Sequence, residues 1–332
     1  MNYINQFDMR GLHRSGWCYI LDNLHDKQNT NSILCDFYLD RTFHWNNNIL
    51  KQLKVIPYTS PWIGFIHHTM DENYTDYNTT AMFKNKSFLD SLKCCKALIV
   101  LSNYLKEQII NHMSNINISV PVYSLVHPTE FISQDKMFTI DKFKANTNRK
   151  LIQVGAWLRD INAIFQLEID SELLIQKTAL VGKKMESYYN LNNNDTENIP
   201  APISRDKRKR KHIKNKKVNI ITHLEDSMYD DLLSNNLIFL KLIDASAVNT
   251  IIECVVRNTP ILVNKLPAVV EILGDNYPLY YNNLNEVNSL LTMKNIEVAY
   301  NYLKKLDKTK LHINTFIKDF DDILRKINII KN

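Results

Sequence analysis

The residues best suited to bind a phosphorylated ligand lie between Leu242 and Gly274, in the stretch LIDASAVNTIIECVVRNTPILVNKLPAVVEILG. An apolar run typical of a strand ends at Asp244, and a helical pattern begins near Val248 or Asn249. The first amides of a helix lack intrahelical partners, and the helix dipole favours negative charge there. We therefore expect an anion-binding site at this strand-to-helix junction.

The residue types at the junction suit that role. Small side chains let a phosphate approach the backbone, and hydroxyl and amide groups add hydrogen-bond donors. Glu253 lies one turn into the helix, where a carboxylate can accept two hydrogen bonds from the vicinal hydroxyls of a ribose. An ordinary capped helix with Glu253 on its surface explains the same residues. The junction residues are Ala245, Ser246, Ala247, Asn249 and Thr250.

A second group of candidate residues lies in the N-terminal half. The apolar run PWIGFIHHTM ends in His67 and His68, and CDFYLDRTFHW places Asp36, Asp40 and Arg41 at another strand end. Paired histidines are half of a possible metal site, but no third ligand lies at a suitable spacing. Histidines buried at the rim of the fold are the alternative interpretation.

The elements that must position these residues form a regular alternation. Short runs rich in Ile, Val and Leu alternate with amphipathic segments through most of the 332 residues. Continuous apolar strands between helices predict parallel sheets covered on both faces, so we expect two doubly wound α/β domains. Ligands of such sheets bind at the carboxyl ends of the strands, where the strand order reverses. The expected strands lie within 32–39, 62–68, 96–102, 120–127, 150–157, 174–182, 217–224, 237–243, 259–264 and 277–281, and the expected helices within 87–96, 103–114, 160–167, 228–236, 248–258 and 268–273.

The periodicity lapses between residues 133 and 150, which places a domain boundary there. We expect a first domain over 1–147, a second over 148–294, and helices over 295–332 that pack back onto the domains. Asp319-Phe320-Asp321 spells D-x-D, a known metal-binding motif. It falls inside an amphipathic helical pattern, so we interpret it as a solvated helix face.

Composition limits the classes of function. Hydrophobic residues make up 45% of the chain, enough for packed cores. The start of the chain lacks a signal-peptide pattern, no apolar run is long enough to span a membrane, and five scattered cysteines suggest reduced thiols, so we expect a cytoplasmic protein. Much of the net charge of +6 lies in RDKRKRKHIKNKK, residues 205–217. That run is either a solvated loop, our expectation, or a nucleic-acid patch or nuclear signal.

The segment YDDLLSNNLIFLKLIDASAVNTIIECVVRNTPILVN resembles the donor-binding core of family-4 retaining glycosyltransferases, which have the two-Rossmann-domain GT-B architecture. In that family an acidic residue, seven further residues and a glutamate lead into an apolar helix and a Gly-x-Pro-Val-Val strand. Glu253 matches the glutamate, which implies that it binds the donor ribose. Asn258 or Thr259 stands in place of the glycine. The position of the first acid is Ala245, so Asp244, one residue away, is the candidate for its role.

Other segments follow in the order of the family. KLIQVGAWLRDINAIFQL resembles the first strand of the donor domain, which implies that Gly155 and Arg159 face the diphosphate. ALVGKKM occupies the next strand end, so Lys183 or Lys184 is expected to supply a second cation. Such cations suit the negative charge of a departing nucleoside diphosphate and replace a metal ion. The remaining matches are Gly16 in the N-terminal loop that faces the donor, His67 near the sugar, Ser102 as a helix cap and His127-Pro128 before the linker.

The resemblance implies a glycosyltransferase that moves a sugar from a nucleoside diphosphate to an unidentified acceptor, with retention of configuration and no metal or other cofactor. The first domain would hold the acceptor and the second the donor. His67 and Asp244 are the expected catalytic residues, with His68 and Asp36 on the acceptor side. Similar sequences occur among predicted glycosyltransferases of giant viruses, which would place the protein in host cytoplasm. The alternatives are a nucleic-acid-binding or nucleic-acid-modifying protein that uses residues 205–217, and a non-catalytic homologue that binds a sugar nucleotide.

Overall fold

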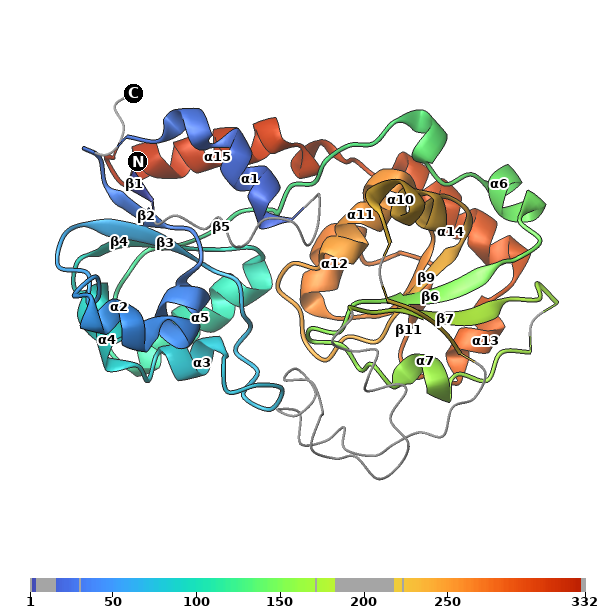
Figure 1. The fold of residues 1–332 in the computed structure, drawn as a ribbon, viewed down its shortest axis with the longest axis horizontal. Coiled ribbons are helices and arrows are strands. Elements are labelled where there is room, and N and C mark those ends of the chain that lie inside the picture. Colours follow the sequence, from blue (N-terminus) through green and yellow to red (C-terminus); the bar gives the residue numbers. More distant parts are fainter. Residues whose placement is uncertain are drawn as a thin grey trace. The chain divides into compact units, whose positions relative to one another are not determined.

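The computed structural model describes residues 16–29, 31–170, 172–182, 218–222 and 224–329, together with the backbone of residues 2–3. The chain forms two compact units (Figure 1). The first comprises residues 1–130, 246–249 and 309–332, and the second comprises residues 131–245 and 250–308. The domain limits expected at residues 147 and 294 remain predictions about independently folding domains.

The first unit is built on a five-stranded parallel sheet whose strands follow one another in chain order. The strands are β1 (Asn2–Tyr3), β2 (Leu34–Asp36), β3 (Trp62–Ile66), β4 (Cys95–Val100) and β5 (Val122–Ser124). The α-helices are α1 (Trp17–Asn23), α2 (Asn47–Gln52), α3 (Thr79–Met82), α4 (Lys86–Leu92), α5 (Asn103–Asn115) and α15 (Ile313–Lys326).

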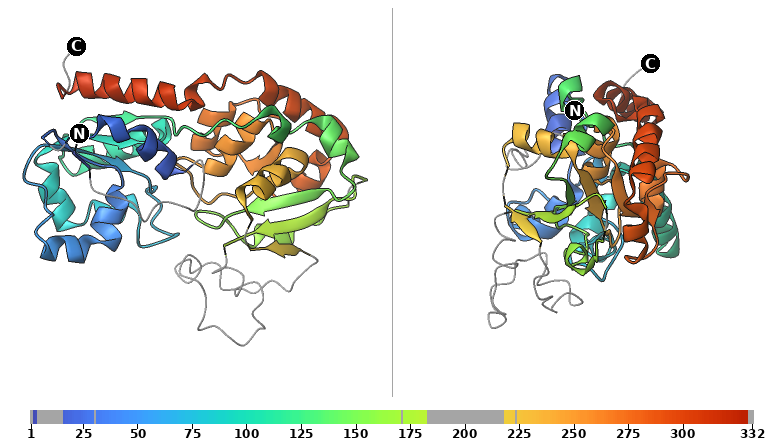
Figure 2. Two further views of the ribbon diagram at one scale, coloured as in Figure 1. Left: turned by 45° about the horizontal axis from the view of Figure 1, so that its top comes forward. Right: turned by 90° about the vertical axis from the view of Figure 1, so that its right-hand side faces the viewer.

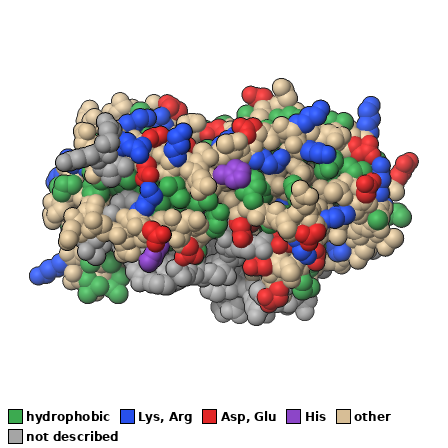
Figure 3. Space-filling view, turned by 90° about the horizontal axis from the view of Figure 1, so that it is seen from above, with side chains coloured by type: hydrophobic (Ala, Val, Ile, Leu, Met, Phe, Trp, Pro, Cys, Tyr) green, Lys and Arg blue, Asp and Glu red, His purple; other side chains and the backbone are tan. Residues whose placement is uncertain are grey.

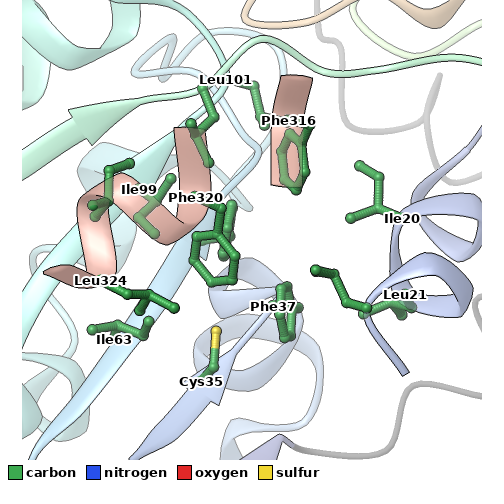
Figure 4. Close-up of a cluster of buried hydrophobic side chains, with 14 of the residues drawn as sticks. Ile20, Leu21, Cys35, Phe37, Ile63, Ile99, Leu101, Phe316, Phe320 and Leu324 are labelled. Atoms are coloured by element: carbon green, nitrogen blue, oxygen red, sulfur yellow. The ribbon is translucent and has the colours of Figure 1, made fainter. Parts of the chain in front are cut away.

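Both faces of this sheet are covered, which explains why its strands read as continuous apolar runs. Along β4, Ala97 and Ile99 join one buried cluster, while Leu98 and Val100 join another. α1 and α15 cover the first cluster, in which side chains of both helices meet strand residues (Figure 4). α3, α4 and α5 cover the second. The two faces thus receive alternate residues of the same strand.

The C-terminal helix α15 belongs to the first unit and lies along one face of its sheet (Figure 2). Phe316 and Phe320 enter the core from this helix. The D-x-D residues lie inside it, and Asp321 accepts a 2.7 Å hydrogen bond from Lys27. The sequence assigned this motif to a helix, and the structure agrees.

The second unit contains a six-stranded parallel sheet in the order β11-β10-β9-β6-β7-β8. The strand order reverses between β6 and β9, so the carboxyl ends of these neighbouring strands form the topological switch point. The strands are β6 (Lys150–Val154), β7 (Gln176–Leu180), β8 (Asn219–Ile221), β9 (Leu237–Leu240), β10 (Ile261–Asn264) and β11 (Tyr280–Tyr281).

Helices accompany this sheet, and five of the seven described α-helices overlap segments that the sequence predicts to be helical (Figures 1 and 2). They are α6 (Ile140–Ala145), α7 (Ala163–Gln166), α10 (Asp226–Asn235), α11 (Asn249–Arg257), α12 (Pro267–Leu273), α13 (Glu286–Leu290) and α14 (Met293–Lys305). The prediction of two parallel α/β sheets is confirmed, and each of the ten expected apolar runs contains a strand. Among the described helices, none is long and apolar enough to cross a membrane.

Candidate functional site

The loop that follows β6 begins with a glycine that the backbone requires. Gly155 has a φ of +72°, in the left-handed region that side-chain-bearing residues rarely adopt. A Cβ at this position would lie 3.5 Å from Cζ and Nη1 of Arg159. The guanidinium group therefore lies over Gly155, and the two residues predicted to face the diphosphate are in contact.

Two loops at the switch point fix the position of Arg159. Its backbone forms an antiparallel bridge with Leu242, in the loop after β9. On either side of that bridge, the Asp160 amide donates to the Lys241 carbonyl at 2.8 Å and the Ile243 amide donates to the Leu158 carbonyl at 2.8 Å. Because β6 and β9 are neighbours, the loops that follow them run side by side and pair.

The Arg159 side chain reaches the start of helix α11. Nη2 donates a 3.2 Å hydrogen bond to the hydroxyl of Thr250, and Nη1 donates a 2.8 Å bond to the Trp157 carbonyl. Thr250 is buried in the first turn of α11. A guanidinium group, a helix N-terminus and a glycine therefore lie at one point of the second unit, a combination suited to a phosphate.

The residues before α11 differ in their surroundings. Ser246 is 5% exposed, and its hydroxyl has no hydrogen-bond partner within the described part of the chain. Ala247 packs, partly buried, against the apolar cluster of the first unit, to which residues 246–249 belong. Asn249 is the first residue of α11. The carboxylate of Asp244 accepts a 2.8 Å bond from the amide of Ala245.

Glu253 is held by a tyrosine from the neighbouring helix. Its Oε2 accepts a 2.7 Å hydrogen bond from the hydroxyl of Tyr229 in α10. The carboxylate is 4% exposed, and burial, followed by the charge of Glu253, raises the pKa of Tyr229 well above its usual value. Four residues further along α11, Arg257 donates a 2.7 Å bond to Asp230. The two contacts fix α11 against α10 and leave lone pairs of Glu253 for a ligand.

In the first unit, His67 follows β3 and is tightly positioned. Its Nε2 lies 2.9 Å from the carbonyl of Phe37, and a carbonyl only accepts, so Nε2 carries the proton and Nδ1 carries the lone pair. The rings of Trp17 and Tyr38 meet the His67 ring edge-on, with their centroids 4.4 and 4.2 Å from its centroid. Burial lowers the pKa of His67 to about 4, so the ring is neutral at pH 7.

Asp40 organises both histidines. Its Oδ2 accepts the amide of His67 at 2.8 Å, and its Oδ1 accepts the amide of His68 at 3.1 Å. The His68 ring donates through Nδ1 to the Tyr77 carbonyl at 2.6 Å. Asp40 is completely buried, so its structural function is to fix the turn after β3. The described residues contain no group of three His, Cys, Asp or Glu arranged to hold a metal.

Asp36 is also completely buried at the end of β2. Its carboxylate accepts the amide of Tyr38 at 2.9 Å and the hydroxyl of Tyr58 at 2.9 Å. Burial raises its pKa, and these hydrogen bonds act in the opposite direction. The structure thus gives Asp36 an internal anchoring role, while a role toward an acceptor stays a prediction.

The other predicted residues have the following positions. Gly16 is buried and precedes α1 as its N-cap. Ser102 caps α5 by accepting the amide of Leu105, as expected. His127 is buried and its Nδ1 donates to the Pro128 carbonyl at 2.7 Å. Lys183 and Lys184, and the basic run at 205–217, lie outside the described residues. On the face shown in Figure 3, basic side chains of the described residues are interspersed with acidic ones.

Sequence reasoning missed Tyr229 and Asn264, and it named Asp40 without assigning it a role. Asn264 at the end of β10 binds both backbone groups of Leu242, with its Oδ1 2.7 Å from the amide and its Nδ2 3.0 Å from the carbonyl. This clamp fixes the loop that pairs with Arg159. A polar residue closing the apolar run TPILVN was the available signal, because an amide at a strand end commonly binds neighbouring backbone.

No protein-family model matches the chain, and no curated protein matches its sequence. Solved structures do match. The E. coli trehalose-6-phosphate synthase bound with UDP-2-fluoro glucose is 11% identical, with a TM-score of 0.56 over 97% of this chain and 80% of that one. The UDP-forming trehalose-phosphate synthase of Burkholderia xenovorans is 10% identical, with a TM-score of 0.54 over 92% and 76%.

A third match is an S. aureus TarM variant in complex with fondaparinux, alpha-GlcNAc-glycerol and UDP. It is 12% identical, with a TM-score of 0.59 over 92% of this chain and 58% of TarM. At such identities the likeness concerns the fold. The chain has the GT-B fold, with two Rossmann-like α/β domains.

Proposed function

We propose that the protein is a glycosyltransferase that moves a sugar from a nucleoside diphosphate donor to an acceptor. The observation that carries the proposal is the contact of Arg159 with Gly155 and with Thr250, at the switch point of the second sheet. Ligands of open α/β sheets bind at such points. Solved structures of the same fold include proteins bound to UDP or a UDP sugar, which supports a nucleotide-sugar donor.

In this proposal Arg159 and the first amides of α11 bind the diphosphate. Departure of a nucleoside diphosphate builds negative charge on its oxygens, and fixed donors lower the barrier most where charge develops. Arginine suits this role because its planar group forms two parallel hydrogen bonds with a phosphate. The contact with Thr250 keeps the guanidinium beside the helix start, so little reorganisation is needed when the donor binds.

Glu253 binds the donor ribose. It lies one turn into the helix whose first amides would hold the phosphates, and Tyr229 holds one of its oxygens. A carboxylate accepts hydrogen bonds from both vicinal hydroxyls of ribose, whereas a 2′-deoxyribose offers only one of the two. The proposal therefore includes selectivity for ribonucleotides.

His67 acts on the sugar or the acceptor hydroxyl through Nδ1, since Nε2 is engaged by Phe37. Its ring is neutral at pH 7 and accepts a hydrogen bond there. Retention of configuration and catalysis without a metal complete the proposal, both on the basis of the sequence resemblance. Measuring the anomer formed, and activity in excess chelator, tests them separately.

One observation favours a second candidate, a non-catalytic protein that binds a sugar nucleotide. The first acid of the family motif is replaced by Ala245, and the carboxylate of Asp244 is bonded to the adjacent amide. A sugar contact from this position then depends on Asp244, whose carboxylate is already held by the chain itself. Such a protein would bind the donor without releasing nucleoside diphosphate.

The experiment is a thermal-shift screen with UDP, GDP, ADP, CDP and their glucose conjugates. A ligand at 100 times its dissociation constant stabilises a protein by about 2.7 kcal/mol. The melting temperature of the wild type should rise with the nucleotides of one base. The rise should be smaller for Arg159→Gln and Glu253→Gln. The matched control is Arg325→Gln, at an exposed arginine of α15 paired with Asp322. Equal responses of all variants would contradict the assignment. Binding without nucleoside diphosphate release, toward water or any acceptor, would favour the second candidate.

A further inference from the structure

An exposed apolar ridge crosses the first unit between β2 and β3. Trp45, Ile49 and Leu53 are 43, 56 and 65% exposed, and Val55, just after them, is 40% exposed. Few large apolar side chains elsewhere in the described chain are as exposed. We call Trp45, Ile49, Leu53 and Val55 the ridge. Soluble domains rarely gather exposed apolar side chains without a partner.

The backbone explains why these side chains point outward together. A π-helical turn over Arg41–Trp45 runs into α2, where the Leu50 amide donates to the Asn46 carbonyl and the Leu53 amide to the Ile49 carbonyl, both at 2.9 Å. Residues four apart share a helix face. Leu50 packs against the buried cluster beneath, so Ile49 and Leu53 face solvent.

The segment that carries the ridge has no acidic side chain of its own. Residues 41–70 contain no Asp or Glu, while Lys51 and Lys54 are exposed beside the ridge. Neither lysine forms an ion pair with any described residue.

The neighbouring helix α4 meets the start of α2 through Asn85, which donates to Asn47 at 3.0 Å. On α4, Lys86 and Lys93 share the single carboxylate of Asp90. These three side chains of the α4 segment thus add net positive charge.

We propose that the ridge and its lysines bind the surface of an anionic phospholipid bilayer. A tryptophan and aliphatic side chains flanked by lysines are the pattern of elements that lie in a membrane interface. Anionic headgroups attract such lysines, and residues 41–70 contribute no acidic side chain that would oppose this attraction. The four ridge side chains alone cannot supply the area of a stable contact between copies of the chain, which needs about 800 Å² per partner. This inference is independent of the proposed glycosyl transfer.

The test is co-sedimentation of the full chain with vesicles of phosphatidylcholine alone or mixed with phosphatidylserine. We expect binding to the mixed vesicles that weakens with salt, because surface charges are screened. The variants Ile49→Ser/Leu53→Ser and Lys51→Gln/Lys54→Gln should each lower the affinity about tenfold or more. The matched control is Met228→Ser/Val298→Ser, which changes two exposed apolar residues of the second unit. All substituted side chains are exposed, and unchanged melting curves verify folding.

Four outcomes would overturn the inference. One is that the wild type sediments with neither kind of vesicle, and another is that the ridge variants sediment as the wild type does. Binding that is lost only when residues 205–217 are neutralised would assign it to that run. Self-association of the wild type, abolished by Ile49→Ser/Leu53→Ser without vesicles, would show that a second copy covers the ridge. Nucleotide binding, measured on the same variants, should be unchanged and so separates this test from that of the proposed function.

Discussion

The hydroxyl of Tyr229 donates a 2.7 Å hydrogen bond to Oε2 of Glu253, from one helix of the second unit to the next. Glu253 is buried and Tyr229 is half-buried, so the bond restricts the carboxylate to one orientation. A positioned carboxylate binds a ribose with less loss of side-chain entropy than a mobile one. Tyr229 is therefore a positioning residue for the proposed donor site.

Removing this hydroxyl should affect the recognition of ribose. We predict that Tyr229→Phe lowers stability by about 1–3 kcal/mol, because a buried carboxylate loses a donor. It should also reduce the preference for a ribonucleoside diphosphate over its 2′-deoxy form. Titrating wild type and variant with both forms of the nucleotide selected by the screen checks this. A loss of stability with unchanged preference would make Tyr229 purely structural.

Arg159 should govern phosphate binding. We predict that Arg159→Lys retains part of the affinity for a nucleoside diphosphate, whereas Arg159→Gln loses about 10- to 100-fold, the cost of charge-assisted hydrogen bonds. Affinity for the unphosphorylated nucleoside should not change in either variant. Calorimetric titration checks each ligand, and an equal loss for nucleoside and diphosphate would refute the role.

Burial of His127 should make stability depend on pH. Its pKa is lowered to about 4 by burial, against about 6.5 in the unfolded chain. The contribution of the neutral, buried His127 to the free energy of unfolding is fully present above pH 6.5. It is lost as the pH falls toward 4, because over that range His127 binds a proton in the unfolded chain but not in the folded protein. That loss amounts to about 3 kcal/mol.

Denaturant unfolding of His127→Asn over this pH range measures the contribution. The variant keeps a donor for the Pro128 carbonyl and should show a flatter pH profile than the wild type. His25→Asn, at an exposed histidine of the same unit, should retain the wild-type slope. If the free energy of unfolding of His127→Asn falls with pH as steeply as that of the wild type, His127 is not the source of the pH dependence.

The close packing of Leu39 against β3 requires a glycine at position 64. A Cβ there would lie 2.8 Å from three side-chain carbons of Leu39, which is completely buried. We predict that Gly64→Ala lowers the free energy of unfolding by about 1–3 kcal/mol, the usual effect of overpacking. Gly182→Ala, where a Cβ would meet nothing within 4 Å, is the matched control. Adding Leu39→Ala to Gly64→Ala should relieve the clash, and an unaffected Gly64→Ala would contradict the packing argument.

Much of the fold was predictable because its strands are covered on both faces. The run KALIVLS reads as continuous apolar sequence since Leu98 and Ile99 each meet a different core. The structure adds α1, whose segment the sequence analysis treated as a loop. Trp17, Ile20, Leu21 and Leu24 are spaced as on one helix face and are all buried, so the signal was present but unused.

The site was predictable as single residues but not as contacts. Arg159 and Thr250 are 91 positions apart, and only the neighbouring placement of β6 and β9 brings them together. Whether a side chain is buried likewise depends on how distant parts of the chain pack together. Asp36 lies within a strand-like run and Asp40 directly after it, where the sequence places them among the candidate residues, yet the packing around them leaves both completely buried. The cytoplasmic location, the viral origin and the role of residues 205–217 remain predictions.

The central claim is that the loops after β6 and β9 form a nucleoside diphosphate site. The most direct measurement is a calorimetric titration of the wild type and Arg159→Gln with UDP, GDP, ADP and CDP, with Arg325→Gln as control. The account predicts that the wild type and the control bind one of these nucleotides with equal affinity, and that Arg159→Gln binds it at least about tenfold more weakly. Equal affinity of Arg159→Gln, or no binding of any diphosphate by the wild type, would contradict it.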